Sequence, residues 1–454
     1  MTNFKRHIYK NLTDWKKNPE RKPLILRGAR QVGKTTLIHE FANTYKNQIF
    51  LNLERNSDLE FLQKYNDATT LTEALFIKNN ILPDEKKDTL LFIDEIQESE
   101  KAIGMLRFFH EDIPELHVVA AGSLLEHKIK KVHSFPVGRI NYLFLHPLNF
   151  PEFLEAMGQD IANEHLKTIP VKKTAHQTLL DLFHIYAIIG GMPEIVKTYI
   201  ATKSIASLPP VYESIWETYK NDIEKYAQNN SEMRVIRHIV NTAYLHFNRR
   251  IRYHNFGNSN YRSREVGEGF RSLDDAKIIQ IIYPATSVVP PIIPDIRKSP
   301  KMQFLDTGIL NFELKIQDEL LSIDNLSTIY KGEIIPHLIF QELISMNSTS
   351  YKKPTFWVRE KSQSSAEVDL LFPYRNMIIP VEIKSGSHGT LRSLHQFIEQ
   401  TNHPYAVRMY AGEFFIEQAK TPSGKPYILM NIPYYLSTEL EKYLQFFIEN
   451  HTLS

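Results

Sequence analysis

The segment from Gly28 to Thr35 reads Gly-Ala-Arg-Gln-Val-Gly-Lys-Thr, which is the pattern G-x-x-x-x-G-K-T. It follows an apolar run at 23–26 and precedes a helix-length segment, the context that a phosphate-binding loop requires. The glycines allow backbone conformations closed to other residues, so backbone N–H groups can wrap around two phosphates. The start of the next helix turns its positive dipole end toward the anion. The pattern therefore predicts a site for a nucleoside triphosphate.

Lys34 and Thr35 end this loop and carry its two charge-handling side chains. We expect the Lys34 ammonium to reach the β- and γ-phosphates and the Thr35 hydroxyl to bind Mg²⁺. A chance glycine-rich turn is the alternative, and a second motif argues against it. The remaining residues predicted to contact the nucleotide belong to the loop and the first helical turn: Gly28, Ala29, Arg30, Gln31, Val32, Gly33 and Thr36.

The second motif is an apolar run, Leu90 to Ile93, that ends in Asp94 and Glu95. A carboxylate at the tip of a buried strand is costly unless a cation or a hydrogen-bond network takes it up. At the carboxyl edge of a parallel sheet it faces the ligand crevice. We expect Asp94 to hold Mg²⁺ through water and Glu95 to polarise the attacking water as general base. No Asn-Lys-x-Asp guanine-reading motif is present, which favours ATP over GTP.

Two further polar residues are candidates for the catalytic set. Ser123 follows the apolar run 117–121, on a strand expected between the other two, and is predicted to lie near the γ-phosphate. It could equally cap a helix, because Glu126 stands three residues on. Arg139 is predicted to stabilise the transition-state charge, since its own charge is permanent and its donors form a fork. A surface salt bridge is the alternative for Arg139.

Five short apolar runs, each followed by a helix-length segment or a loop, organise the first part of the chain. Runs of this kind predict parallel strands buried on both faces, and hence an α/β domain. Residues 148–230 look helical, interrupted at Gly190-Gly191-Met192-Pro193. Residues 231–300 contain two helices and a β-type run, which predict a winged helix-turn-helix. The five apolar runs are 23–26, 48–53, 89–93, 117–121 and 142–145.

A basic segment lies within the predicted winged helix. From Arg249 to Arg271 there are six arginines (249, 250, 252, 262, 264 and 271) against two glutamates (265 and 268), with Tyr, His and Asn interleaved. Arginine can pair with phosphates bidentately, and amides can read base edges. The winged-helix interpretation places residues 262–271 on the helix that enters the groove. The segment predicts DNA contact, with a protein-facing or solvated helix as the alternative.

Asp369, Glu382 and Lys384 form a third candidate cluster near the C-terminus. Residues i and i+2 of a strand share a face, so Glu382 and Lys384 project together, and Asp369 on a neighbouring strand can join them. Such a set is typical of metal-dependent phosphodiester cleavage, in which the acids bind Mg²⁺ and the lysine steadies the nucleophile. An internal ion network is the alternative.

Taken together, these motifs resemble a family of prokaryotic AAA-type P-loop ATPases. Its members carry a C-terminal conserved domain of unknown function with a restriction-endonuclease-like fold. The resemblance implies a P-loop NTPase core at 1–147, a helical lid-like region at 148–230, a winged helix at 231–300 and an α/β endonuclease-like domain at 301–454. The matching segments are 26–35, 91–97, 121–125, 135–139, 190–194, 304–308 and 381–386.

The resemblance also assigns individual residues. Arg139 matches a family arginine close to the nucleotide or a subunit boundary. Pro193 matches a Gly-x-Pro element that related signal-transducing ATPases press against bound nucleotide, with a plain helix break as the alternative. One departure concerns the C-terminal domain, because Pro336 stands where relatives commonly have a glutamate. Loss of a carboxylate weakens a metal site, which favours a degenerate, structural domain over an active nuclease.

Composition narrows the remaining choices. The 454 residues include 54 Lys and Arg against 52 Asp and Glu, so net charge alone does not indicate nucleic-acid binding. The chain has no cysteine, which excludes disulfides, a thiolate nucleophile and a zinc–thiolate site. The polar N-terminus and the lack of an 18-residue apolar run predict neither a secretory signal nor a membrane helix, and we expect a cytoplasmic protein.

The predicted function is hydrolysis of Mg-ATP to drive a conformational switch, acting on or near DNA. A protein partner or a second copy of the chain is also expected. One alternative is a nucleotide-binding scaffold with little turnover that recruits DNA or protein. The other is an ATP-dependent nuclease that uses the C-terminal cluster.

Overall fold

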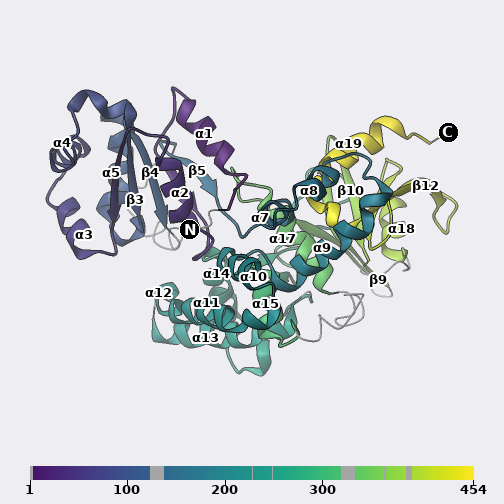
Figure 1. Ribbon diagram of the computed structural model, residues 1–454. Coiled ribbons are helices and arrows are strands. Elements are labelled where there is room, and N and C mark those ends of the chain that lie inside the picture. The colour runs from purple at the N-terminus through teal and green to yellow at the C-terminus, as the bar shows by residue number, and fades with distance from the viewer. Residues whose placement is uncertain are drawn as a thin grey trace. The chain divides into compact units, whose positions relative to one another are not determined.

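The computed structural model describes residues 4–122, 138–227, 229–247, 249–317, 333–361, 364–384 and 391–453. The chain forms two compact units (Figure 1). The N-terminal unit comprises Met1–His146 with the short segments Asp275–Lys277 and Asn347–Tyr351. The C-terminal unit comprises Pro147–Asp274, Ile278–Met346 and Lys352–Ser454. The three domains predicted for residues 148–454 thus lie mostly within one compact unit.

A five-stranded parallel sheet forms the centre of the N-terminal unit, in the order β2-β3-β4-β1-β5. Every residue of β3 and β4 is buried, as expected for strands covered on both faces. β4 lies between β1 and β3, as the sequence predicted, and the parallel α/β fold is confirmed. The strands are β1 (Leu24–Arg27), β2 (Asn47–Asn52), β3 (Thr89–Asp94), β4 (His117–Gly122) and β5 (Asn141–Phe144).

Helices cover both faces of this sheet. Leu91 and Ile93 pack in one apolar cluster with residues of α4 and α5. Phe92 between them points to the other face, where its ring lies 6.3 Å from that of His39 on α2. Successive side chains of β3 thus contact helices on opposite faces of the sheet. The unit therefore has three layers, with the sheet between two layers of helices. The helices are α1 (Tyr9–Lys17), α2 (Lys34–Ala42), α3 (Asn56–Gln63), α4 (Ala68–Lys78) and α5 (Glu100–Asp112), with the short turns η1 (Pro83–Asp88) and η2 (Ile96–Glu98).

The C-terminal unit begins with a helical region, as predicted for residues 148–230. Gly190 and Gly191 separate α9 from α10, and the chain bends there by 119°. The helices are α7 (Phe150–Ala156), α8 (Asp160–Leu166), α9 (His176–Ile189), α10 (Pro193–Thr202), α11 (Pro209–Asn221) and α12 (Ile223–Tyr226), with the turns η3 (Lys173–Ala175) and η4 (Ile205–Ser207).

Two helices and a two-stranded sheet follow, in the region predicted to be a winged helix. β6 (Ile279–Ile282) pairs antiparallel with β7 (Lys301–Phe304), so the predicted boundary at 300 falls between two paired strands. The winged-helix assignment itself stays a prediction. The other elements are α13 (Asn230–Thr242), η5 (Ala243–His246), η6 (Phe256–Asn258) and α14 (Ser263–Asp275).

A six-stranded mixed sheet, β12-β13-β11-β10-β9-β8, dominates the last part of the chain. Leu394 and Ile398 of α18 pack against Ala406 and Leu429 of two central strands. The endonuclease-like assignment stays a prediction. The strands are β8 (Thr355–Lys361), β9 (Ser364–Tyr374), β10 (Met377–Ile383), β11 (Tyr405–Tyr410), β12 (Phe415–Lys420) and β13 (Pro426–Pro433); the helices are α15 (Thr307–Glu313), α17 (Ile334–Ser345), α18 (Arg392–Ile398), α19 (Leu440–Asn450) and the turn η7 (Tyr434–Glu439).

A buried polar cluster joins α9 to α17 in this unit. The Tyr186 hydroxyl lies 2.8 Å from Leu148 O and 2.5 Å from Glu342 Oε1, and Glu342 Oε2 accepts from Phe150 N at 2.9 Å. A hydroxyl has one hydrogen, so it can donate to only one of its two acceptors. A protonated Glu342 that donates to Tyr186 satisfies every group. Burial, which raises the pKa of Glu342 to about 8, agrees with this state.

No single helix among the described residues has the length and apolar composition to cross a membrane. The bent pair Lys173–Ile189 and Pro193–Thr202 reaches that length and composition together. Its apolar side chains, including Leu179 and Phe183, are buried inside the C-terminal unit.

Candidate functional site

The loop between β1 and α2 has the backbone that a phosphate-binding loop needs. Gly28, Gln31 and Gly33 all have positive φ, at 151°, 62° and 96°. A Cβ placed on Gly28 would lie 2.3 Å from the backbone oxygen of Leu145, which follows β5. Only glycine fits there, because both the conformation and the space exclude a side chain. The first glycine of the motif is therefore required by the neighbouring strand.

Lys34 lies inside this loop, with its side chain almost fully buried. Its ammonium donates to the backbone oxygens of Gly28 at 3.0 Å and Ala29 at 2.8 Å. Burial lowers the pKa of Lys34 to about 8, and the negative charges of Glu95 and Asp94 oppose this shift only in part. The ammonium thus sits in the loop that should receive the phosphates, as predicted.

Thr35 and Asp94 meet at the carboxyl edge of the sheet. Thr35 Oγ1 donates to Asp94 Oδ2 at 2.7 Å, although the two residues are 59 positions apart. Burial raises the pKa of the Asp94 carboxyl, and the bond from Thr35 opposes that shift. A hydroxyl and a carboxylate are hard oxygen donors of the kind that Mg²⁺ prefers. These two residues therefore fit the predicted metal site.

Glu95 turns the chain directly after β3. It has the left-handed conformation (φ 49°, ψ 45°), and its N–H donates to Asp94 Oδ1 at 3.1 Å. The Glu95 carboxylate accepts a hydrogen bond from the side-chain amide of Gln97. Gln97 was not among the predicted site residues. Its sequence signal is weak: a polar residue two places after the acid, in a turn that also contains Glu98 and Ser99.

Arg6 braces the loop from the N-terminal segment. Its guanidinium donates to Val32 O at 3.0 Å, within the loop, and to His146 O at 2.6 Å, at the last residue before the chain enters the C-terminal unit. No local pattern marks Arg6, because its partners lie 26 and 140 positions away. Arg6 was therefore not among the predicted site residues.

Arg30 and Thr36 were also predicted to contact the nucleotide. Arg30 pairs with Glu54, with 3.3 Å between Nη2 and Oε1, at a partly exposed position beside the loop. Thr36 is exposed on the first turn of α2. Ser123 falls outside the described residues, so its predicted role at the γ-phosphate stays a prediction.

Arg139 lies at the opposite edge of the sheet from the phosphate-binding loop. β1 and β5 run parallel, with Arg27 opposite Phe144. The loop follows the carboxyl end of β1, whereas Arg139 precedes the amino end of β5, so a strand length of about 13 Å separates them. The Arg139 guanidinium pairs there with Glu111 at 2.5 Å. The role of Arg139 at a nucleotide, whether of its own or of a neighbouring subunit, stays a prediction.

Pro193 begins α10 in the C-terminal unit, a position where its missing N–H costs nothing. The preceding glycines dock onto the segment 304–308. Asp306 Oδ2 accepts from Gly191 N at 2.7 Å, and a Cβ on Gly190 would lie 2.1 Å from Asp306 Oδ1. Two of the segments noted in the sequence therefore contact each other. The contact of Pro193 with a nucleotide stays a prediction.

The C-terminal cluster assembles as its spacing suggested. β9 and β10 are antiparallel neighbours, and Asp369 Oδ2 accepts from Ile383 N at 2.9 Å. Lys384 Nζ donates to Glu382 Oε1 at 2.6 Å. Burial raises the pKa of both acids, that of Glu382 to about 8. The three side chains therefore lie in one hydrogen-bonded group at the ends of β9 and β10.

A metal site at this cluster gains no further support. Among the described residues, no group of three His, Cys, Asp or Glu side chains is placed to hold a metal ion. Pro336 lies in the first turn of α17, where proline is tolerated. Lys301 adds a second positive charge, pairing with Glu367 at 2.7 Å. The weak second metal site stays a prediction.

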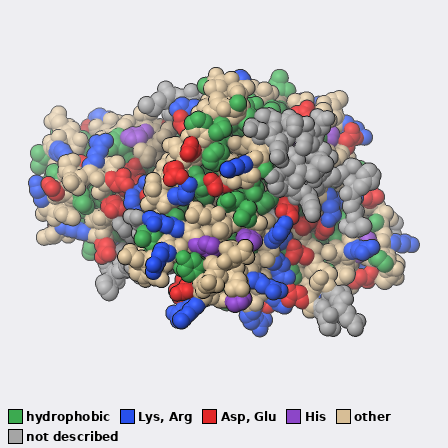
Figure 2. All heavy atoms as spheres, turned by 90° about the horizontal axis from the view of Figure 1, so that it is seen from below, with side chains coloured by type: hydrophobic (Ala, Val, Ile, Leu, Met, Phe, Trp, Pro, Cys, Tyr) green, Lys and Arg blue, Asp and Glu red, His purple; other side chains and the backbone are tan. Residues whose placement is uncertain are grey.

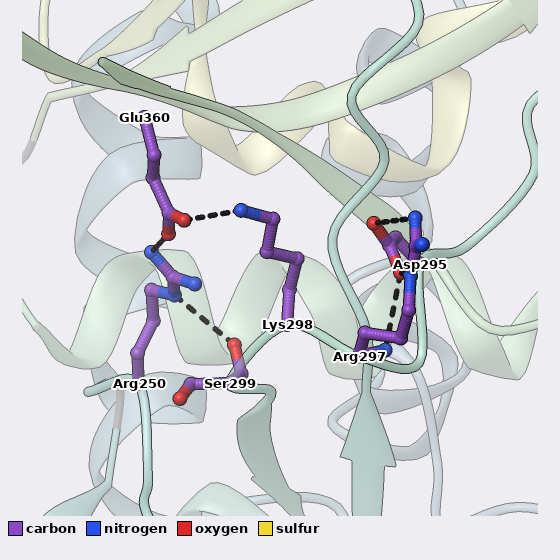
Figure 3. A network of polar contacts seen from close by, with 6 residues as sticks. All are labelled: Arg250, Asp295, Arg297, Lys298, Ser299 and Glu360. Atoms are coloured by element: carbon purple, nitrogen blue, oxygen red, sulfur yellow. Dashed lines mark hydrogen bonds and ion pairs between the residues drawn. The ribbon is translucent and has the colours of Figure 1, made fainter. Parts of the chain in front are cut away.

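The basic segment divides into paired and exposed arginines. Arg250 Nη1 pairs with Glu360 of β8 at 2.5 Å and Nε donates to Ser299 O at 3.0 Å, while Lys298 contacts the same carboxylate (Figure 3). Arg250 is therefore part of an internal network. Arg264 and Arg271 on α14 are 87% and 68% exposed.

The exposed arginines do not stand in a purely basic surface. Glu268 lies between Arg264 and Arg271 on α14, at 2.9 Å from the first and 3.8 Å from the second. Figure 2 shows basic and acidic side chains interspersed over the face in view. DNA contact by this segment therefore stays a prediction.

Three family models match different parts of the chain. Residues 20–154 match the family model of an AAA domain. The parallel sheet, the loop and both acids lie within that match, so this part of the chain is similar to an AAA domain. Residues 180–320 and 331–433 match two domains of unknown function (DUF8612 and DUF4143). The chain matches no curated protein.

Three solved structures show weaker likeness. The Walker-type ATPase PABY2304 of Pyrococcus abyssi is 14% identical, with 69% of this chain and 96% of that chain covered at a TM-score of 0.46. The STAND protein PH0952 of Pyrococcus horikoshii, which has a tetratricopeptide repeat sensor, is 14% identical, with 76% and 46% covered at 0.29. The Pif1 helicase of Candida albicans is 13% identical, with 40% and 48% covered at 0.23.

Proposed function

We propose that this protein binds Mg-ATP in its N-terminal unit and hydrolyses it to drive a conformational switch in the rest of the chain. The hydrogen bond of 2.7 Å between Thr35 Oγ1 and Asp94 Oδ2 carries the proposal. It joins the two side chains that would hold the counter-ion of a triphosphate. The charge of Lys34, buried beside Asp94 and Glu95, completes a site with both signs of charge.

Lys34, Thr35, Asp94 and Glu95 each have a separate role in the proposed binding and hydrolysis of ATP. The Lys34 ammonium exchanges two neutral carbonyl acceptors for phosphate oxygens, which are stronger acceptors because they are charged. When bound, Mg²⁺ offsets phosphate charge, held by Thr35 and, through water, by Asp94. Glu95 accepts the proton of the attacking water. Gain and loss of γ-phosphate contacts then change the conformation of the chain.

Steady-state hydrolysis with two matched variants tests this proposal. Lys34→Ala should abolish ATP binding, because Lys34 is the one lysine in the loop at residues 28–35, all of which the structure describes. Glu95→Gln should bind ATP as the wild type does and lose turnover, because an amide cannot accept the proton. Failure of the wild type to bind Mg-ATP contradicts the proposal. Binding with turnover no higher than that of Glu95→Gln supports the alternative, a nucleotide-binding scaffold.

Nucleic-acid binding is the second function that we propose, supported by the exposure of Arg252, Arg262, Arg264 and Arg271. Each arginine that contacts a phosphate should release counterions, so the logarithm of the association constant falls linearly with the logarithm of salt concentration. Arg264→Ala should reduce the slope by about 1. Arg250→Ala is the matched control, because Arg250 is already paired with Glu360. Absence of salt-dependent binding to duplex DNA contradicts this proposal.

An ATP-dependent nuclease is the remaining alternative. The closeness of Asp369 and Glu382 favours it, whereas their lysine partners and Pro336 oppose it. Mg²⁺-dependent nicking of DNA that is lost in Glu382→Ala would establish it. Without such nicking, the C-terminal domain is a degenerate, structural one.

A further inference from the structure

The side chain of Gln97 is buried next to the proposed general base. Gln97 is 1% exposed, and its amide nitrogen donates to Glu95 Oε2. The direction of this bond follows from chemistry, since a carboxylate can only accept and the amide must present its nitrogen. The contact uses one oxygen of the carboxylate and leaves the other for a water molecule.

The space for this amide comes from the next strand. Gly122 ends β4, and a Cβ built on it would lie 2.1 Å from Gln97 Oε1. Gly122 has no positive φ, so its backbone conformation does not require glycine. Its role is to leave room for the amide. Among the described residues Gln97 Oε1 has no hydrogen-bond partner, so a single bond to Glu95 orients the whole amide.

We propose that Gln97 is a positioning residue that holds the Glu95 carboxylate for proton transfer, seated on Gly122. This inference rests on the proposed ATP hydrolysis. Glutamate has three rotatable side-chain bonds, and fixing such a chain has an entropic cost that a base must meet before it can act. The hydrogen bond from Gln97 already restricts the Glu95 side chain in the folded protein, before the reaction begins. Gln97 itself contacts neither nucleotide nor water in this role.

The prediction is a loss of turnover without a loss of binding. Misplacement of a reacting group by about 1 Å can cost about a hundredfold in rate. Gln97→Met keeps the volume of the side chain and removes the donor. We expect its kcat for ATP to fall by about ten- to a hundredfold, with the Kd for ATP within about twofold of wild type.

Gly122→Ala provides a second route to the same defect. Its Cβ displaces the Gln97 amide without changing Gln97, so kcat should fall similarly. In the double variant Gln97→Met with Gly122→Ala, the two effects should not add, because both break one contact. Full additivity would overturn the assignment. The single variant Gly122→Ala also tests the proposal if Gln97→Met does not fold.

Ser99→Ala is the matched control. Ser99 lies in the same turn, is buried, and caps α5 through a bond from Ala102 N at 3.2 Å, yet no contact joins it to Glu95 among the described residues. It should keep the wild-type kcat. A kcat loss in Ser99→Ala equal to that in Gln97→Met would overturn the assignment, since any disturbance of the turn would then suffice.

The remaining outcomes separate this inference from the proposed function. A wild type that hydrolyses ATP and loses turnover in Glu95→Gln, while Gln97→Met stays within twofold, overturns the role of Gln97 alone. A wild type without turnover contradicts ATP hydrolysis itself, and with it the inference.

Discussion

Gly28→Ala tests whether the backbone oxygen of Leu145 confines the phosphate-binding loop. The new methyl group would lie 2.3 Å from that oxygen, well inside contact distance. Leu145 cannot move freely, because its N–H donates to Arg27 O at 2.8 Å and so joins β5 to β1. The loop or the strand must therefore shift. Gly138→Ala is the matched control, because Gly138 also has positive φ (76°) and an added Cβ there meets none of the described residues within 4 Å.

The size of the effect follows from two contributions. Holding alanine at the φ of Gly28, 151°, costs roughly 1–3 kcal/mol. Loss of the bond between Leu145 and Arg27 adds about 1 kcal/mol. Gly138→Ala carries only the conformational cost, about 1–2 kcal/mol. The difference of about 1–2 kcal/mol should also appear as a loss of ATP affinity of about 5- to 30-fold, since the bound loop must adopt the strained conformation.

Hydrogen exchange followed by mass spectrometry is the suitable stability assay, because two compact units need not unfold in one transition. Amides of β1 and β5 should exchange faster in Gly28→Ala than in Gly138→Ala, and calorimetric titration with ATP should show the affinity difference. Equal protection and equal affinity in the two variants would contradict this prediction, since the Leu145 oxygen would then not confine the loop.

Three further predictions concern charge and support. With the pKa of Lys34 lowered to about 8, ATP affinity at fixed Mg²⁺ should fall about tenfold from pH 7 to pH 9, whereas Lys34→Arg should stay flat; a flat wild-type profile would contradict this. Between its ordinary pKa of 4.5 and about 8, Glu342 binds more protons in the folded state than in the unfolded one. Its contribution to stability is therefore lost as the pH rises. Glu342→Gln mimics the protonated acid, so the Tm difference in its favour should grow from pH 5 to pH 9, and a constant difference would argue against a neutral Glu342. Arg6→Ala should destabilise the loop by about 1–3 kcal/mol and weaken ATP binding, measured by exchange and titration. Unchanged exchange at Val32 would show that Arg6 is not a brace.

The local structure of the proposed nucleotide site was largely predictable, because the residues that form it are consecutive in the sequence. Gly28 to Thr35 carry the loop, and Leu90 to Glu95 carry a buried strand with two acids at its end. Apolar runs on both sides specified parallel strands, and the carboxyl ends of parallel strands lie at the same edge of a sheet. The meeting of Thr35 with Asp94 follows from these local facts, although the two are far apart in sequence.

Other predictions stayed open where long-range packing decides the surroundings of a residue. The pattern around Arg139 could not show that the residue lies at the amino edge of the sheet, beside Glu111. The count of arginines between 249 and 271 could not show that Arg250 forms an ion pair with Glu360, a residue about a hundred positions away. Both outcomes depend on which strands and helices become neighbours.

The sequence by itself determined the strands, the loop and the pair of acids, because backbone conformation and the alternation of buried faces depend on nearest neighbours along the chain. The tertiary structure alone decided that Gln97 rests on Gly122, that Arg6 braces Val32, and that Gly28 faces Leu145. The contact of Gln97 with Gly122 requires β4 beside β3, and that of Gly28 with Leu145 requires β5 beside β1. The motifs predicted one part of the strand order, β4 between β1 and β3, whereas the places of β2 and β5 depend on the packing of the whole fold.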